Sequence, residues 1–171
     1  MQHFQKHPDV EVVLLLSNNP KAYALERAKK FNVPAMVFSR EQLNNGEVIH
    51  WLKEAGVTHV VLAGFLWLLP STLLHVFPDR IINIHPSLLP KHGGKGMYGD
   101  KVHQAVKRAG DQRTGISVHL VNEQFDEGRI IFQADCEVAA EDTPETIATK
   151  VHALEHRYFP SVIEAWALGR N

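Results

Sequence analysis

Cysteine is almost absent from this sequence, with Cys136 the only one among 171 residues. One thiol excludes an internal disulfide framework and any zinc site built on several cysteines, and it is ordinary for a reducing cytosol. Long apolar runs are missing as well, since none approaches the ~18 residues that span a membrane. Residues 1–7 carry no apolar segment of the kind found in secretion signals. We therefore expect a soluble, cytoplasmic protein.

Neither sign of charge dominates the composition. Eighteen Lys and Arg stand against nineteen Asp and Glu, which gives a formal net charge of −1. No positive excess indicates a nucleic acid or an anionic membrane as partner, so a small-molecule ligand is the better expectation. With 44% hydrophobic residues, a chain of this length can bury the core of one compact domain.

Strand and helix patterns alternate through the first half of the chain. Residues 10–16 form an almost continuous apolar run, which predicts a strand buried on both faces in the middle of a parallel sheet. Further strands are predicted at 35–38, 58–62 and 80–84, with helices at 21–31, 48–55 and 73–77 between them. This order predicts right-handed crossovers and an α/β fold with a doubly wound, mostly parallel sheet.

The second half predicts an antiparallel strand pair and a long helix. Segments 114–121 and 129–138 are rich in β-branched residues, and the loop between them carries Asp126. Glycines make 91–99 an irregular, mobile loop before a helix at 101–109. Thr143 and Pro144 have the pattern of a helix start. Because neither a linker nor a repeat is visible, one domain over 1–171 is predicted.

Two polar side chains mark the end of the strand at 80–84. Ligands of parallel sheets gather at the carboxyl edge of the strands, and Asn83 and His85 lie two residues apart there, on one face. An amide donor beside an imidazole can stabilise an oxyanion and shuttle a proton near neutral pH. Taken alone, however, Asn-x-His before Pro86 also fits a structural hydrogen-bonding arrangement.

Histidine is frequent, with eleven residues that include His85, His92, His103 and His119. Their spacing matches no zinc motif, so no metal is expected, and solvated or hydrogen-bonded histidines account for them.

Two motifs carry a resemblance to a known family. Residues 83–90, Asn-Ile-His-Pro-Ser-Leu-Leu-Pro, resemble the signature of the folate-dependent formyltransferases, and residues 115–119 with 124–128 resemble their second signature. The similarity runs from about Val10 into the C-terminal helix, and it is strongest to the phosphoribosylglycinamide formyltransferases. It implies transfer of a formyl group from 10-formyltetrahydrofolate to the amine of glycinamide ribonucleotide, in de novo purine biosynthesis.

The resemblance also implies roles for individual residues. Asn83 and His85 match the pair that stabilises the oxyanion, and Asp126 matches the acid that pairs with the histidine and helps to move the proton. His119 is either a helper at this site or an ordinary strand histidine. Pro86, Ser87 and Glu155 match positions that hold the ribonucleotide, although Glu155 also fits an exposed helix residue paired with a lysine.

The folate is expected to lie against an apolar segment and to contact Asp126 as well. That segment consists of Phe65, Leu66, Trp67, Leu68 and Leu69. Core and loop packing is the alternative explanation for these side chains. Trp67 stands where some members of the family carry a basic residue, so contacts to the pterin or to its glutamate tail are expected to differ.

The beginning of the chain departs from the family pattern. Members open with a strand and a phosphate-binding loop at a helix N-terminus, whereas this sequence starts where the first helix should end. We therefore expect an N-terminally incomplete domain with weak or no turnover from residues 1–171 alone. Two alternatives stay open: a formyltetrahydrofolate deformylase and a non-catalytic folate-binding remnant. The resemblance implies a monomer or a weak homodimer.

Overall fold

The computed structural model describes residues 1–170, and their contacts divide them into two compact units. The first unit contains Met1–His59 and Leu69–Phe77, and the second contains Val60–Leu68 and the chain from Pro78 onward. The prediction of a single domain over 1–171 stays a prediction.

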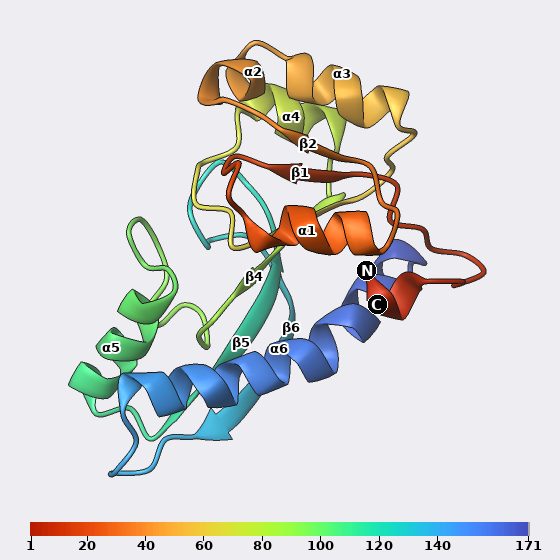
Figure 1. Ribbon diagram of the computed structural model, residues 1–171. Coiled ribbons are helices and arrows are strands. Elements are labelled where there is room, and N and C mark those ends of the chain that lie inside the picture. Colours follow the sequence, from red (N-terminus) through yellow and green to blue (C-terminus); the bar gives the residue numbers. More distant parts are fainter. Residues whose placement is uncertain (171) are drawn as a thin grey trace. The chain divides into compact units, whose positions relative to one another are not determined.

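The first unit is a two-stranded parallel sheet with helices. Its register runs from Leu15↔Ala35 to Ser17↔Val37, and α1 contacts both strands (Figure 1). Ser39 caps α2 through a reciprocal pair of hydrogen bonds with Gln42, which fixes where that helix begins. The elements are the 3₁₀ helix η1 (Gln2–Phe4), β1 (Leu15–Ser17), α1 (Tyr23–Lys30), β2 (Ala35–Val37), α2 (Arg40–Asn44), α3 (Glu47–Glu54) and α4 (Ser71–Val76).

The apolar run at 10–16 does not form the predicted strand. Only Leu15–Ser17 are in β1, all three are partly exposed, and β2 is its one strand partner within residues 1–170. Burial on both faces requires strands on either side and packed layers above and below. Because β2 is itself only three residues long, the pairing cannot extend further toward Val10. The prediction of a fully buried, central strand was wrong for this segment.

The second unit holds a four-stranded mixed sheet in the order β3-β4-β5-β6. β4 is parallel to β3 and antiparallel to β5, and β5 is antiparallel to β6, which confirms the predicted C-terminal strand pair. The α/β fold class is likewise confirmed. The elements are β3 (Val60–Ala63), β4 (Ile81–His85), α5 (Asp100–Ala109), β5 (Arg113–Leu120), β6 (Ile130–Glu137) and α6 (Pro144–Ala167).

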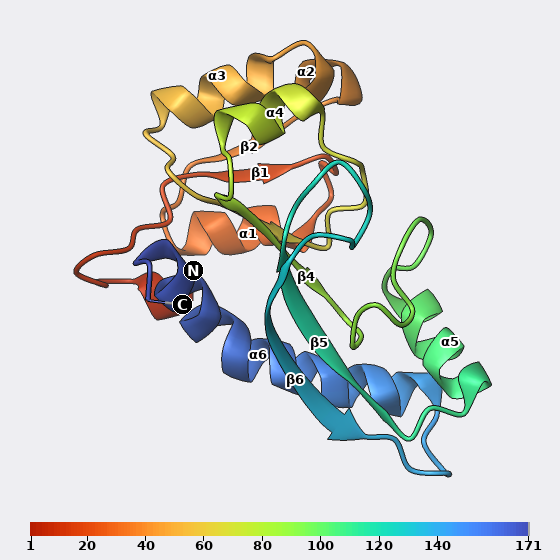
Figure 2. The same cartoon turned by 180° about the vertical axis from the view of Figure 1, so that it is seen from behind.

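β4 and β5 present a different chemistry on each face. Side chains alternate along a strand, so Ile82 and Ile84 point to one face while Asn83 and His85 point to the other. The apolar face packs against α5 and α6 (Figure 2). Its core consists of Ile82, Ile84, Val106, Ile116, Val118, Leu120, Ile147, Val151, Val162 and Trp166. This core fixes the sheet that carries the polar face.

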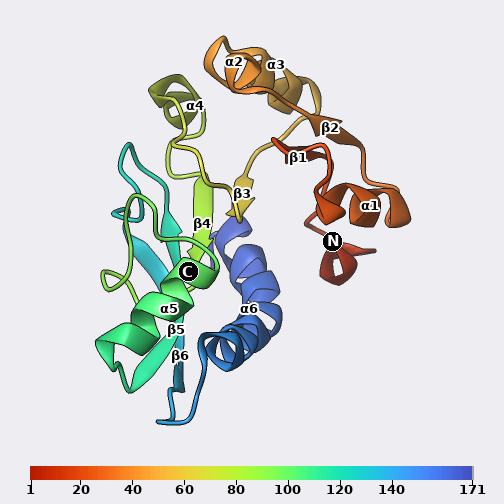
Figure 3. The ribbon, with the colours of Figure 1, turned by 60° about the vertical axis from the view of Figure 1, so that its left-hand side comes forward.

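Helix α6 lies along the sheet and contacts β5, β6 and α5 (Figure 3). Thr143 caps it through the backbone N–H of Thr146, and Pro144 occupies the first turn, as predicted. Asp142 accepts hydrogen bonds from Lys150, the Ala139 amide and the Thr146 hydroxyl, which together lower its pKa to about 2. No helix within residues 1–170 is both long and apolar enough to cross a membrane.

Candidate active site

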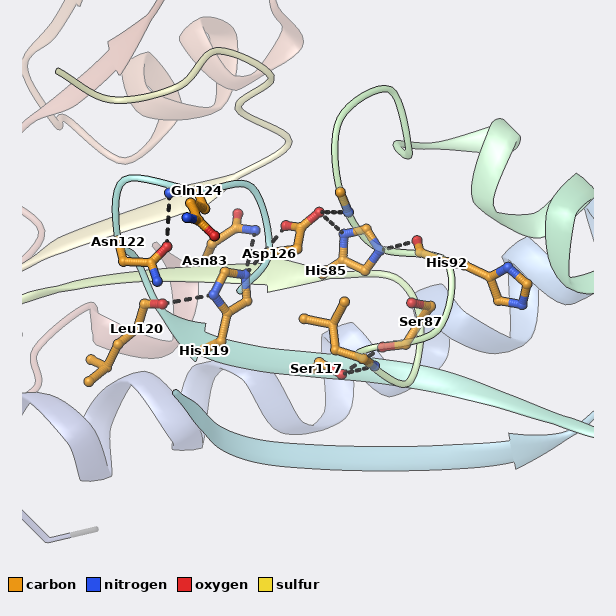
Figure 4. Close-up of polar contacts among 12 residues, drawn as sticks. Asn83, His85, Ser87, His92, Ser117, His119, Leu120, Asn122, Gln124 and Asp126 are labelled. Carbon is orange, nitrogen blue, oxygen red and sulfur yellow. Dashed lines mark hydrogen bonds and ion pairs between the residues drawn. The ribbon is translucent and has the colours of Figure 1, made fainter. Parts of the chain in front are cut away.

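Asn83 and His119 are opposite each other on the polar face of the sheet. They are a cross-strand pair of β4 and β5, and Asn83 Nδ2 lies 3.1 Å from His119 Nε2 (Figure 4). The His119 Nδ1–H donates to the carbonyl of Leu120 at 2.8 Å, so Nε2 is the nitrogen left to accept from the amide. An amide NH₂ carries two protons, and Asn83 therefore has a second one to offer a ligand.

His85 follows on the same face and is almost entirely buried, with 3% of its surface exposed. Its Nε2–H donates to the backbone carbonyl of His92 at 2.8 Å, and its Nδ1 faces Asp126 Oδ2 at 3.4 Å. Burial lowers the pKa of His85 below its usual 6.5, and the opposing charge of Asp126 offsets this only in part. His85 is therefore neutral at pH 7, with Nδ1 able to take up a proton beside a carboxylate.

Asp126 stands on the β5–β6 loop with a left-handed backbone, φ 59°. Its Oδ2 accepts the backbone N–H of Gly94 at 2.9 Å, and its Oδ1 lies 3.5 Å from His119 Nε2. Burial by itself raises the pKa of Asp126, but His119, the charge of His85 and the Gly94 amide outweigh burial and lower the pKa overall. The carboxylate is thus ionised and lies between two imidazoles.

A hydrogen-bonded turn joins β4 to the glycine-rich loop. Ser87 is fully buried, and its hydroxyl donates to the carbonyl of Lys91 at 2.6 Å. The Ser117 hydroxyl donates to the Ser87 carbonyl at 2.7 Å and accepts from the Leu89 amide, while Gln133 donates to both Ser117 and Leu89. These bonds hold the start of the 86–92 turn against β5.

The end of the turn is held by side chains from two different loops. His92 Nε2–H donates to Asp111 Oδ2 at 2.6 Å, and Lys91 Nζ donates to Asp111 Oδ1 at 2.8 Å. Asp111 follows Gly110, whose left-handed backbone ends α5. Sequence reasoning named the glycine-rich loop but did not predict roles for Gly94, His92 or Asp111. In the sequence, His92 was visible only as one of several histidines that fit no zinc motif, and Gly94 only as part of a glycine-rich, irregular loop. Nothing in the sequence singled out Asp111.

The remaining predicted site residues are Pro86, Glu155 and the apolar segment 65–69. Pro86 is half-buried in the turn, and Glu155 is half-buried on α6, where burial raises its pKa. Phe65 and Trp67 meet edge to face at 6.0 Å, and Leu66 and Leu68 are exposed. Leu69 is buried, but it belongs to the first compact unit. Binding roles for all of these residues stay predictions.

The arrangement can stabilise a growing negative charge and move a proton. Asn83 supplies an amide donor, His85 a neutral imidazole, and Asp126 a carboxylate that favours the imidazolium form. Among residues 1–170, no group of three or more His, Cys, Asp or Glu side chains is arranged to hold a metal ion. Such a site fits acyl transfer, in which a carbonyl oxygen becomes an oxyanion.

Comparison with known proteins defines the class. The sequence pattern of the formyl transferase family matches residues 1–163. The chain therefore belongs to the formyl transferase family.

Its relatives point to a particular member of that family. The chain is 40% identical to the phosphoribosylglycinamide formyltransferase of Bacillus subtilis, over 95% of this chain and 83% of the relative. It is 42% identical to the chloroplastic phosphoribosylglycinamide formyltransferase of Arabidopsis thaliana, over 91% of this chain. The crystal structure of the Anaplasma phagocytophilum enzyme of the same name superimposes with a TM-score of 0.88, at 33% identity, over 98% of this chain and 79% of that one.

The chain spans about half the length of the two chloroplastic relatives, 55% of the Arabidopsis protein and 51% of that from Vigna unguiculata.

Proposed function

We propose that this protein is a phosphoribosylglycinamide formyltransferase, which transfers the formyl group of 10-formyltetrahydrofolate to the amine of glycinamide ribonucleotide in purine biosynthesis. The observation that carries the proposal is the convergence of Asn83, His85 and Asp126 on one sheet face, in a chain of the formyl transferase family. The names of the relatives support the choice of acceptor.

The first step is attack of the ribonucleotide amine on the formyl carbon. The carbonyl oxygen then carries a full negative charge. Asn83 is the donor that stabilises it at once, and His85 adds a positive charge beside it when Nδ1 has taken up the proton. Asn83 donates the Nδ2 proton that His119 does not use. A donor aimed at the oxyanion typically contributes ~10²–10³ in rate, because it is already oriented before the charge develops.

The second step is removal of the proton from the attacking nitrogen. The Nε2–H of His85 is committed to the His92 carbonyl, so Nδ1 takes up the proton. Asp126, 3.4 Å from Nδ1, stabilises the imidazolium that forms. The Nδ1–H of His85 then donates its proton to the folate nitrogen as the carbon–nitrogen bond to the folate breaks, which returns His85 to its neutral form and closes the proton balance. Positioned proton transfer of this kind typically contributes ~10²–10⁴ in rate.

The substrates are assigned to the segments that the family resemblance indicates. We assign the folate to Phe65–Leu69 and Asp126, and the ribonucleotide to Pro86, Ser87 and Glu155. The exposed Leu66 and Leu68 offer apolar surface for a pterin. We place the reaction in the cytoplasm, and we assign the protein no nucleic-acid partner, no membrane partner and a monomeric or weakly dimeric state.

Formyl transfer is tested directly with purified protein, 10-formyltetrahydrofolate and glycinamide ribonucleotide. The 171-residue chain and the full product of its gene are assayed side by side, and release of tetrahydrofolate is followed by absorbance. From the full gene product we expect release that requires the ribonucleotide and yields its formylated product, and we expect His85→Ala in that product to abolish both. Wild-type rates from His85→Ala would remove the role proposed for that residue.

Omission of the ribonucleotide separates the proposal from its main rival. A deformylase uses water as the acceptor, so it releases formate and tetrahydrofolate at the same rate with and without the amine. That result would replace the transferase by a deformylase, whereas folate binding without any release would identify a non-catalytic folate-binding protein.

A further inference from the structure

We propose that His92 and Asp111 are positioning residues, which hold the segment Lys91–Gly94 where its backbone orients both His85 and Asp126. This inference deepens the proposed function and rests on it. Neither side chain touches the reacting atoms. Their effect is transmitted through two backbone groups of a short segment, one carbonyl and one amide.

The two backbone groups act on opposite ends of the same ion pair. The carbonyl of His92 accepts the Nε2–H of His85 at 2.8 Å, and the N–H of Gly94 donates to Asp126 Oδ2 at 2.9 Å. The first bond determines which imidazole nitrogen carries a proton, and the second orients the carboxylate that faces the other nitrogen (Figure 4). A displacement of the segment therefore disturbs both proton-handling groups together.

The backbone at His92 is in a conformation that few side chains adopt. His92 has a left-handed φ of 53°, which is costly for a residue with a Cβ, whereas Gly94 adopts its φ of 93° without that cost. Gly93 is closely packed, because a Cβ there would lie 2.5 Å from Leu89 Cδ2 and 3.3 Å from Asp126 Cβ. A strained, closely packed turn needs an external attachment to stay in place.

The bond between His92 and Asp111 is that attachment. The Nε2–Oδ2 distance is 2.6 Å, and the two side chains are only 16% and 14% exposed. Asp111 is set at the end of α5, a helix that packs against α6 and the apolar core. The His92–Asp111 bond thus connects the segment Lys91–Gly94 to the end of α5. Lys91, the second partner of Asp111, is 69% exposed, so its ion pair contributes little to holding the segment.

Three substitutions and one control test the proposal. Asp111→Ala removes the acceptor, and Asp111→Asn keeps an oxygen that can still accept from His92. His92→Asn removes the imidazole but keeps a residue that tolerates a left-handed backbone. Lys91→Met is the matched control, since it removes the other contact of Asp111. Thermal melts first establish that each variant is folded.

The first readout compares the change in kcat with the change in KM for each variant. We expect kcat of Asp111→Ala and His92→Asn to fall by about tenfold or more, since small misplacements of reacting groups cost rate steeply. We expect KM to stay within about threefold, because neither residue binds substrate. Asp111→Asn should recover most of kcat, and Lys91→Met should be close to wild type. Equal kcat for Asp111→Ala and Lys91→Met would overturn the proposal.

The second readout does not depend on activity. In ¹⁵N-histidine-labelled protein, the Nε2–H of His85 gives a slowly exchanging signal while it is bonded to the His92 carbonyl. We expect faster exchange or loss of this signal in Asp111→Ala and His92→Asn, and retention in Asp111→Asn and Lys91→Met. An unchanged signal in Asp111→Ala overturns the positioning role, whereas an inactive wild type with the expected signals overturns only the proposed function.

Discussion

Two alternating sets of residues on β4 and β5 separate stability from chemistry. Ile82, Ile84 and Val118 face the core, while Asn83, His85 and His119 occupy the intervening positions. A shift of one residue in the register would exchange the two sets, so the apolar core fixes the position of the polar groups that β4 and β5 carry. Single substitutions on the polar face can therefore test chemistry with little loss of core packing.

Asn83→Ala is the first such substitution. It removes the amide donor proposed to hold the oxyanion and leaves His119 Nε2 without that partner. We expect kcat to fall by ~10²–10³ with little change in KM, because the lost interaction is made mainly in the transition state. Steady-state kinetics measure both constants. Gln104→Ala on α5 removes an exposed amide and serves as control. A loss confined to KM would place Asn83 in ground-state binding instead.

The pH dependence of activity follows from the state of His85. Its pKa is lowered below 6.5, first by burial and further by His119 and His92, while Asp126 and the hydrogen bond to the His92 carbonyl oppose the shift. The neutral base is protonated only below that lowered pKa, so activity persists as pH falls past 6.5 and is lost in a more acidic range. The acid limb of kcat/KM should therefore have its midpoint below 6.5.

Asp126→Asn provides the internal check on that assignment. It removes the charge that raises the pKa of His85, so the limb of the residual activity should move to still lower pH. A limb at or above pH 6.5 in the wild type, or one that moves upward in Asp126→Asn, would contradict the role of His85 as the base.

Sequence reasoning named Asn83, His85 and Asp126 as a candidate site, and the structure brings them together, but that reasoning did not name the residues that hold them in place. Asn83 and His85 were predictable because the spacing of two places both residues on one face of a strand, and the family motif supplied Asp126. The Asp111 contact was not predictable, because it depends on how two loops far apart in sequence meet, 19 positions apart. No local pattern encodes such a pair. The hydrogen bond from the Gly94 amide to Asp126 was equally unpredictable, since the sequence showed only that the loop around Gly94 is rich in glycine.

At the scale of elements, the β5–β6 connection depends on Gly128. A Cβ there would lie 1.7 Å from the carbonyl oxygen of Leu120, the same oxygen that accepts from His119 Nδ1. The backbone approaches this closely because Leu120 N–H also donates to Arg129 O at 2.9 Å. This close approach lets the loop turn back and present Asp126 to the sheet.

Gly128→Ala should therefore damage both stability and the site. The methyl group forces the Leu120 carbonyl away, at a cost of roughly 1–3 kcal/mol or more, and His119 loses its acceptor. Chemical denaturation and formyl-transfer kinetics measure the two effects. Gly169→Ala is the matched change, because a Cβ there meets nothing within 4 Å and pays only for its left-handed backbone, about 1 kcal/mol. Similar losses from both variants would show that the close approach is unimportant.

Element boundaries show which sequence signals were sufficient. The capping pattern at Thr143 and Pro144 located α6 correctly, because a helix start is determined by local hydrogen bonds. The apolar run at 10–16 was misleading, because strand length depends on a partner and β2 offers only three residues. Periodicity reports what a segment can bury, whereas pairing is decided by another part of the chain.

At the scale of the whole molecule, the two compact units have very different sheets. In β5, seven consecutive residues after Arg113 are buried, whereas every residue of β2 is exposed and β1 is only partly buried. Opening of a segment costs free energy in proportion to the buried contacts that it breaks. The strands of the first unit should therefore open more easily than those of the second, even though both form ordinary backbone hydrogen bonds.

Amide hydrogen exchange tests this on bonds of matched length. In the first unit, Leu15 N–H donates to Pro34 O at 2.9 Å and Phe38 N–H to Ser17 O at 3.0 Å. In the second, Leu120 N–H donates to Arg129 O and Val121 N–H to Ile81 O, both at 2.9 Å. Because the bonds are alike, any difference in protection reports the free energy of opening. We expect the amides of Leu15 and Phe38 to exchange more than about tenfold faster, a difference of at least ~1.4 kcal/mol. Equal protection would mean that the three-residue strands are stabilised as firmly as β5, and that their exposure is a poor guide to local stability.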